Sequence, residues 1–217
     1  MRLLGRSHKT TRSSRNAQVF QTFLNVTNPV TFKNITFRDT TFGSVKLPKA
    51  TFEYVTFVDS FFNRVVLNGA TFNGSNFEGV AWECSEIDGL TLRDVHFFDS
   101  TITGSKMRSL DAYDVYFDAL RVFDTDLRGI RNLSGHGSTQ TRLSGANLDG
   151  VSYSLLSSFF SGQTQNLFGG GGACVSGNEG LRFAPPSVVR ALTQCPMPPK
   201  EYLDCWGDDA KWPETEK

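Results

Sequence analysis

Three successive segments of 20 residues decide the fold: residues 31–50 are TFKNITFRDTTFGSVKLPKA, residues 51–70 are TFEYVTFVDSFFNRVVLNGA and residues 71–90 are TFNGSNFEGVAWECSEIDGL. From Phe32 to Leu127 every fifth residue is apolar, which makes twenty apolar positions in a row. A period of five fits neither an α-helix, whose apolar face recurs every 3.6 residues, nor one long strand, whose faces alternate every two. The chain must therefore turn after each five-residue unit.

Residues 20 apart show how many units make one turn. If four units make a turn, such residues stack on one another, and each column should keep one type of side chain. One column is all phenylalanine and another all aliphatic: Phe37, Phe57, Phe77, Phe97 and Phe117, and Leu47, Leu67, Ile87, Met107 and Leu127. Turns of three or five units would mix these columns. The sequence therefore predicts a square coil of 20 residues, joined to its neighbours by backbone ladders about 4.8 Å apart.

Two further positions support the same coil. The residue two places before each large apolar one is mostly small or β-branched, as Val45, Ala50 and Val55 illustrate, which predicts a second inward row in a narrow core. In the fourth column, the residue two places after the inward one is often glycine, as at Gly69 and Gly89. Glycine there indicates a corner that needs a positive φ or close stacking.

The five-residue units resemble those of the pentapeptide-repeat family. Residues 70–74 (ATFNG), 75–79 (SNFEG) and 146–150 (ANLDG) carry the resemblance, and the last matches the family's Ala-(Asp/Asn)-Leu-X-X pattern. The resemblance implies a quadrilateral β-helix and, for most members, a structural or binding role. The Phe- and Thr-rich texture of residues 35–42 is also similar to that of the luminal domain of the synaptic vesicle glycoprotein 2 family.

We therefore predict an all-β fold, a pentapeptide-repeat β-helix solenoid of about five to six coils with a short C-terminal helical cap. After Leu127 the register slips by one residue, to Leu133, and Ser138 interrupts it, so the sixth coil is predicted to be irregular. The predicted parts are a basic, disordered leader at 1–19, an N-terminal cap at 20–29, regular coils at 30–130, an irregular last coil at 131–156, a Gly/Ser-rich connector at 157–183, and a helical cap and tail at 184–217.

Charge is distributed unevenly, although the net charge is zero. No acidic residue precedes Asp39, whereas residues 39–130 contain 14 acidic and 8 basic residues, a net of −6. The Arg-, Ser- and Thr-rich leader is typical of an organelle transit peptide, and a solvated tail is the alternative. The leader has no interleaved aromatic residues, which argues against nucleic acid as a partner. No apolar run is long enough to span a bilayer, which leaves association with a membrane protein open.

Candidate binding residues lie on the outside of the last two regular turns. An exposed aromatic cluster on a rigid surface is typical of a protein-binding patch. The alternative is that a loop or the C-terminal segment packs over it. The predicted cluster consists of His96, Phe98, Tyr113, Tyr116 and Phe123.

Cysteines and glycosylation sequons bear on the compartment. Cys195 and Cys205 flank a Pro-rich break and could form a disulfide in an oxidising compartment, and Cys84 and Cys174 could pair if the glycine loop folds back. The sequence leaves the connectivity open. Together with the leader, the possible disulfides favour an organelle or a luminal or extracellular location over the cytoplasm, whereas the sequons occur at close to their chance frequency. The sequons begin at Asn25, Asn34, Asn73 and Asn132.

The sequence contains no catalytic motif that we recognise. Its three histidines are scattered, and no Ser/His/Asp arrangement, zincin motif or nucleophile elbow is present. Residues 169–172 are all glycine, but no Lys-Ser/Thr follows as a phosphate-binding loop requires. Asp39, Asp59 and Asp99 share an outward column that Gly79 interrupts, so we predict no metal site and no cofactor.

We therefore predict a non-enzymatic scaffold that binds a partner protein and takes no small-molecule substrate. Two alternatives follow from the resemblances. The first is a luminal or extracellular glycoprotein domain of a transporter-like protein, with a receptor-type role. The second is a DNA-mimicking topoisomerase-binding protein, as in the quinolone-resistance members of the family.

Overall fold

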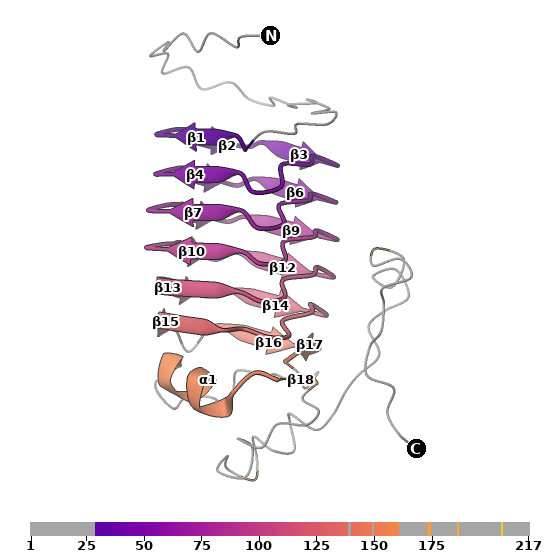
Figure 1. Ribbon diagram of the computed structural model, residues 1–217, viewed down its shortest axis with the longest axis vertical. Helices are drawn as coiled ribbons and strands as arrows, with labels where there is room; N and C mark the ends of the chain where they lie inside the picture. Colours follow the sequence, from indigo (N-terminus) through magenta and orange to yellow (C-terminus); the bar gives the residue numbers. More distant parts are fainter. Residues whose placement is uncertain are drawn as a thin grey trace, which may run out of the picture.

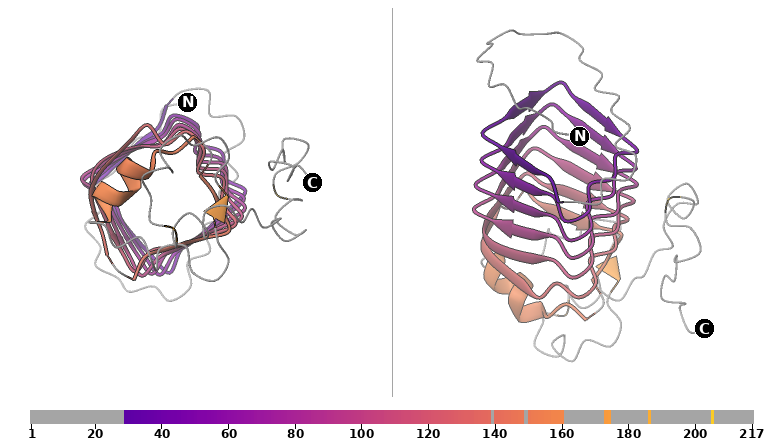
Figure 2. Two further views of the ribbon diagram at one scale, coloured as in Figure 1. Left: turned by 90° about the horizontal axis from the view of Figure 1, so that it is seen from below. Right: turned by 45° about the horizontal axis from the view of Figure 1, so that its top comes forward.

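The computed structural model describes residues 29–138, 140–148, 150–160, 173–174, 186 and 205. Within these residues the chain winds into a stack of about six coils, and each strand pairs in parallel with the strands of the neighbouring coils (Figure 1). Viewed along the stack, the outline is a quadrilateral (Figure 2). The predicted β-helix solenoid is therefore confirmed.

Each coil places short strands on three faces. Face 1 contains β1 (Thr31–Lys33), β4 (Thr51–Glu53), β7 (Thr71–Asn73), β10 (Thr91–Arg93) and the first halves of β13 (Asp111–Asp118) and β15 (Asn132–Gly137). Face 2 contains β2 (Thr36–Arg38), β5 (Thr56–Val58), β8 (Asn76–Glu78), β11 (His96–Phe98) and the second halves of β13 and β15. Face 3 contains β3 (Thr41–Gly43), β6 (Phe61–Asn63), β9 (Ala81–Glu83), β12 (Thr101–Thr103), β14 (Arg121–Phe123) and β16 (Arg142–Ser144).

Face 4 is held together mainly by single bridges. Near the C-terminal end, β17 (Ala146–Asn147) pairs in parallel with β18 (Ala173–Cys174), which lies within the predicted connector at 157–183. The bridges join Lys46, Val66, Glu86, Lys106, Asp126 and Asn147 in that order.

The register between the first five coils is 20 residues, as predicted. Phe57 pairs with Phe77, and their rings stack with centroids 5.1 Å apart and planes only 7° from parallel. Rings of neighbouring columns meet edge to face instead, as for Phe57 and Phe62 at 5.1 Å. Offset stacking and edge-to-face contact are the favourable geometries of aromatic pairs. Inward aromatic residues on three faces of the tube supply both.

Every corner uses the left-handed backbone region. A positive φ recurs at each fifth residue from Asn34 to Gly129. The fourth corner was predicted from its glycines, and Gly69 (φ 70°) and Lys49 (φ 58°) both confirm it. The other corners carry mostly Asp, Asn and Gly, which tolerate this region best, but also Tyr54. The register of the coil therefore overrides local backbone preference there.

Buried hydroxyl groups join one coil to the next. The Thr40 amide donates to the Ser60 hydroxyl at 3.3 Å, and that hydroxyl donates to the Val58 carbonyl at 2.9 Å. The Val55 amide is bound in the same way by Ser75, one coil further on. A buried amide without a partner costs free energy, so serine in the second inward row satisfies a backbone donor that alanine would leave unpaired.

The sixth coil is irregular in its register. Ala112 pairs with Leu133 and Val122 with Leu143, so the register there is 21 residues. Within β15 the register shifts back, and Gly137 rather than Ser138 lies opposite Phe117. The phenylalanine column therefore ends at a residue without a side chain.

The helix α1 (Tyr153–Phe159) closes this end of the tube, below the last coil in Figure 1. The Phe159 ring lies 5.1 Å from that of Phe117, and a Cβ at residue 137 would overlap the Phe160 ring. Aromatic side chains from the helix thus fill the place of a sixth phenylalanine. The helix α1 extends across the predicted boundary at 156/157. The predicted cap at 184–217 lies outside the described residues except for Pro186 and Cys205, as do the leader and residues 20–28.

Candidate functional site

Exposed aromatic side chains gather on face 2. His96 and Phe98 point outward from β11, and Tyr116 points outward from the second half of β13. Phe98 is 49% exposed and Tyr116 50%. The His96 ring lies 6.4 Å from that of Phe98 and 5.9 Å from that of Tyr116. We call these three residues the aromatic patch.

The other two predicted residues lie on neighbouring faces and are half-buried. Tyr113 precedes the corner at Asp114 and therefore belongs to face 1, where the Arg93 guanidinium lies 4.6 Å from its ring centre. The side-chain amide of Asn132 also donates a hydrogen bond to the Tyr113 hydroxyl at 2.9 Å. Phe123 belongs to β14 on face 3. A corner every five residues separates side chains that are close in sequence.

Carboxylates surround the aromatic patch. In register pairing, Phe98 lies between Glu78 of the coil before and Asp118 of the coil after. Asp94 and Asp114 are exposed at the corner with face 1. None of the segments 74–79, 94–99 and 114–119, which carry these residues, contains Lys or Arg. The patch is therefore aromatic and acidic, a combination that the sequence prediction did not identify.

Face 4 carries charges of both signs in close contact. The Arg108 side chain donates to Asp88 at 3.0 Å, and that of Arg128 donates to Asp126 at 2.7 Å. Lys106 and Asp126 are almost fully buried there, at 5% and 3% exposure. Buried charges need partners, so these ion pairs serve the fold.

On face 1, a hydrogen bond from Lys33 to Glu53, with 2.7 Å between nitrogen and oxygen, raises the pKa of the lysine above its usual 10.5. The Lys33 side chain is exposed, and the contact joins the first coil to the second. We assign this pair to the fold as well.

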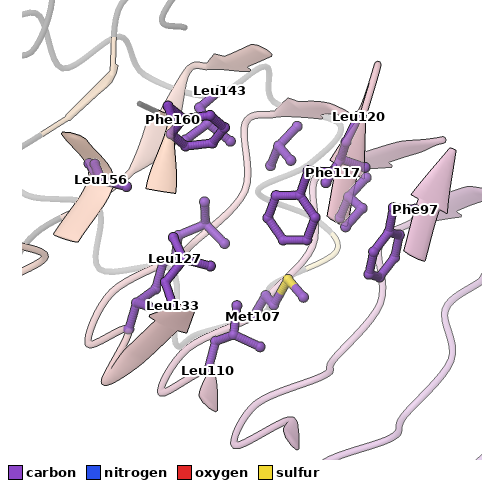
Figure 3. Close-up of a pocket in the computed structure, with 13 residues that line it drawn as sticks. Phe97, Met107, Leu110, Phe117, Leu120, Leu127, Leu133, Leu143, Leu156 and Phe160 are labelled. Carbon is purple, nitrogen blue, oxygen red and sulfur yellow. The ribbon is translucent and has the colours of Figure 1, made fainter. Parts of the chain in front are cut away.

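A small cavity lies inside the C-terminal coils. Its volume is about 30 Å³ and its lining is wholly apolar (Figure 3). Pockets for metabolites are usually roughly 300 Å³ or larger. The cavity is a packing defect rather than a substrate site. Its lining comes from coils four to six and from the helical end, including Met107, Phe117, Leu133, Leu156 and Phe160.

The predicted aspartate column lies at the corner that follows face 2. Asp39, Asp59 and Asp99 all have positive φ, and Asp99 forms an ion pair with Arg121 at 3.0 Å. Within the part of the chain that the structure describes, no three His, Cys, Asp or Glu side chains are grouped as metal ligands would be. The positive φ of these aspartates places them at corners of the coil.

The structure contains a disulfide between Cys84 and Cys205, whose Cα atoms are 5.2 Å apart. The predicted pairing of Cys195 with Cys205 is therefore not the one present, and Cys195 lies outside the described residues. The two cysteines are 121 residues apart in the sequence, and no sequence pattern connects them. Their pairing depends on Cys205 lying beside the third coil, which contains Cys84.

Three of the four predicted glycosylation sites lie in the described residues. Asn34 is exposed at a corner and Asn73 is half-buried on β7. Asn132 is exposed, and its amide also donates to Asp111 at 2.6 Å. Asn25 is outside the described residues, and use of any of these sites stays a prediction.

Part of the β-helix matches a known family of repeats. Residues 47–80 match the family model described as pentapeptide repeats, in eight copies. Residues 47–80 are therefore similar to pentapeptide repeats, and the coils that contain them form a quadrilateral β-helix. No curated protein matches the chain. The expected similarity to synaptic vesicle glycoprotein 2 is not shown and stays a prediction.

Several solved structures are similar at low identity. A trypsin-treated form of QnrB1, a plasmid-mediated fluoroquinolone resistance protein, is 17% identical, with a TM-score of 0.37, over 56% of this chain and 58% of that one. Full-length QnrB1 is 11% identical over 68% of this chain and 84% of its own, with a TM-score of 0.29. HetL, a pentapeptide repeat protein involved in heterocyst differentiation regulation in the cyanobacterium Nostoc sp., is 12% identical over 64% and 77%, with a TM-score of 0.23. None of these values supports a functional argument.

Among the described residues, no helix has the length and apolar composition required to cross a bilayer.

Proposed function

We propose that this chain is a non-enzymatic scaffold that binds a partner protein through the aromatic patch on face 2. The observation that carries the proposal is the half-exposure of Phe98 and Tyr116 on one face of a regular ladder. Single exposed apolar residues are common, whereas a contiguous aromatic group on one face is typical of interaction sites. Aromatic side chains also dominate the energetically important positions of protein interfaces.

The architecture suits this role physically. Backbone ladders bind each strand of the patch to the coils on both sides. The residues beneath the patch, Phe97 and Phe117, are buried in the core. A backbone that is already held in place loses little conformational freedom on binding, which lowers the cost of association. The scaffold therefore supports binding without rearrangement.

The test compares capture of partner proteins by wild type, Phe98→Ser and Tyr116→Ser. We expect each variant to keep the wild-type circular dichroism, because both side chains point away from the core, and to lose about fivefold or more in affinity for the partner. Tyr54→Ser is the matched control, since Tyr54 is 57% exposed but lies in the second coil. Equal capture by wild type and by both patch variants would remove the patch from consideration.

A second candidate role is a luminal or extracellular glycoprotein domain of a transporter-like protein. The Cys84–Cys205 disulfide favours it, because disulfides persist mainly in oxidising compartments. The exposure of Asn34 at a corner supports it further. Expression in a secretory host followed by glycosidase treatment tests the idea, and the absence of a mass shift would count against it. The third hypothesis, a DNA-mimicking topoisomerase-binding protein, has no specific observation in its favour, and a gyrase inhibition assay tests it.

A further inference from the structure

We propose that face 2 binds an arginine-rich segment of its partner, with guanidinium groups stacked on Phe98 and Tyr116 and paired with the carboxylates beside them. This inference rests on the proposed function and names the chemistry of the partner. It follows from the charge of the face, the order of its side chains and a contact of the same type elsewhere in the rod.

The first argument is the charge of face 2. We consider the outward side chains and the two bordering corners in coils two to five, residues 54–59, 74–79, 94–99 and 114–119. These segments contain no Lys or Arg, and Arg121 pairs with the Asp99 carboxylate from face 3. Face 4, by contrast, pairs charges of both signs. The face therefore has a negative potential that attracts a cationic partner. Its carboxylates are Asp59, Glu78, Asp94, Asp99, Asp114 and Asp118.

The second argument is the order of side chains across the face. One column runs Glu78, Phe98, Asp118, so an aromatic ring lies between two carboxylates in successive coils. The next column places Tyr116 after His96. Ladder neighbours are about 4.8 Å apart. A guanidinium over the Phe98 ring would therefore be within reach of a carboxylate on either side.

The third argument is that the rod itself contains such a contact. The Arg93 guanidinium lies 4.6 Å from the centre of the Tyr113 ring, one coil further on. This shows that a ring on a flat ladder face is accessible to a guanidinium from the neighbouring coil. Arginine is favoured over lysine for such a site, because its planar group stacks on a ring while its N–H groups pair with a carboxylate.

The experiment measures fluorescence anisotropy of labelled 12-residue peptides with the full-length protein. The probes alternate glycine with arginine, lysine or glutamate. We expect the arginine peptide to bind about two- to fivefold more tightly than the lysine peptide, which is the range of an exposed cation–π contact. The glutamate peptide should not bind. Affinity for the arginine peptide should fall with added salt, because exposed charges are screened.

Variants separate the two parts of the site. Phe98→Leu and Tyr116→Leu should remove the preference for arginine over lysine and keep the charge. The double variant Glu78→Gln with Asp118→Asn should weaken both cationic peptides by about two- to fivefold and keep the preference. Glu86→Gln is the control, because its side chain is 42% exposed and lies on face 4, outside the proposed site. This control should bind like wild type.

Three outcomes would overturn the proposal. The first is equal binding of the arginine and lysine peptides by the wild type. The second is an equal effect of the face 2 and face 4 charge variants. The third concerns the chain's own basic residues 1–19: if their deletion tightens arginine-peptide binding by about tenfold, they are the occupant of face 2 rather than a separate partner.

The two proposals can fail separately. If the arginine peptide does not bind but Phe98→Ser still loses capture of a partner protein, the arginine inference is wrong and the proposed function stands. If capture by Phe98→Ser and Tyr116→Ser equals that of the wild type, both are wrong.

Discussion

The first three coils and the last three fill the same square tube with different side chains. In the first three, the inward residues of faces 1 to 3 are aromatic, and their rings stack from coil to coil, as for Phe52 and Phe72 at 4.3 Å. In the last three, most of these places hold aliphatic residues such as Leu92, Ile102 and Ala112. The rings of Phe97 and Phe117 no longer stack but meet at 85°. The coil geometry is nonetheless continuous in register up to the sixth coil.

The difference shows that two inward positions share the volume of the core. On face 1, Ala50 precedes Phe52 in the second coil, whereas Leu110 precedes Ala112 in the fifth. On face 3, Ser60 precedes Phe62, and Leu120 precedes Val122. The larger side chain therefore occupies the central inward position of the strand in the second coil and the preceding inward position in the fifth coil. The exchange is incomplete, because a cavity of about 30 Å³ remains beside Leu110, Leu120 and Val122.

The largest expected difference between the two halves comes from removing one ring in each. Phe57→Ala should lower the free energy of unfolding by about 3–5 kcal/mol, because Phe57 is fully buried among stacked rings. Phe117→Ala should cost less, since this ring borders the cavity and is 7% exposed. Urea denaturation of both variants measures the difference. Equal losses would show that the two halves are packed equally well.

A smaller effect is expected at the junction of the last coil with α1. Gly137→Ala should cost about 1–3 kcal/mol, because the new methyl group overlaps the Phe160 ring and forces the helix to shift. Gly43→Ala in the first coil is the matched control, since a Cβ there meets no atom within 4 Å. Thermal unfolding of the two variants measures the change in midpoint. An unchanged midpoint for Gly137→Ala would show that Phe160 does not pack closely against residue 137.

The smallest effect comes from filling the cavity. Val122→Ile adds one methylene group at the cavity wall and should stabilise the protein by up to about 0.8 kcal/mol. Val55→Ile makes the same change among the packed aromatic coils, where Val55 is fully buried, and should destabilise. Denaturation curves of both variants show whether each substitution raises or lowers the free energy of unfolding. Destabilisation by both variants would mean that the cavity cannot accept a methyl group.

The outward position of the aromatic residues could be predicted from the sequence, but which of them share a face, and which carboxylates lie beside them, could not. The outward position of Phe98 follows from the five-residue period, and its exposure agrees. The separation of Tyr113 from Tyr116 depends on the corner at Asp114, which puts neighbours in sequence on different faces. The carboxylates beside Phe98 come from coils 20 residues away in each direction, so they became visible only in the pairing register.

The sequence by itself determined the coil, its register and its corners, because each of these repeats every five or 20 residues and depends on contacts with the same type of residue one coil away. Only the tertiary structure decided how the tube ends, where Gly137 leaves room for Phe159 and Phe160, and that Cys84 pairs with Cys205. These contacts occur once and join segments with no common period. A periodic pattern cannot encode a contact that occurs only once.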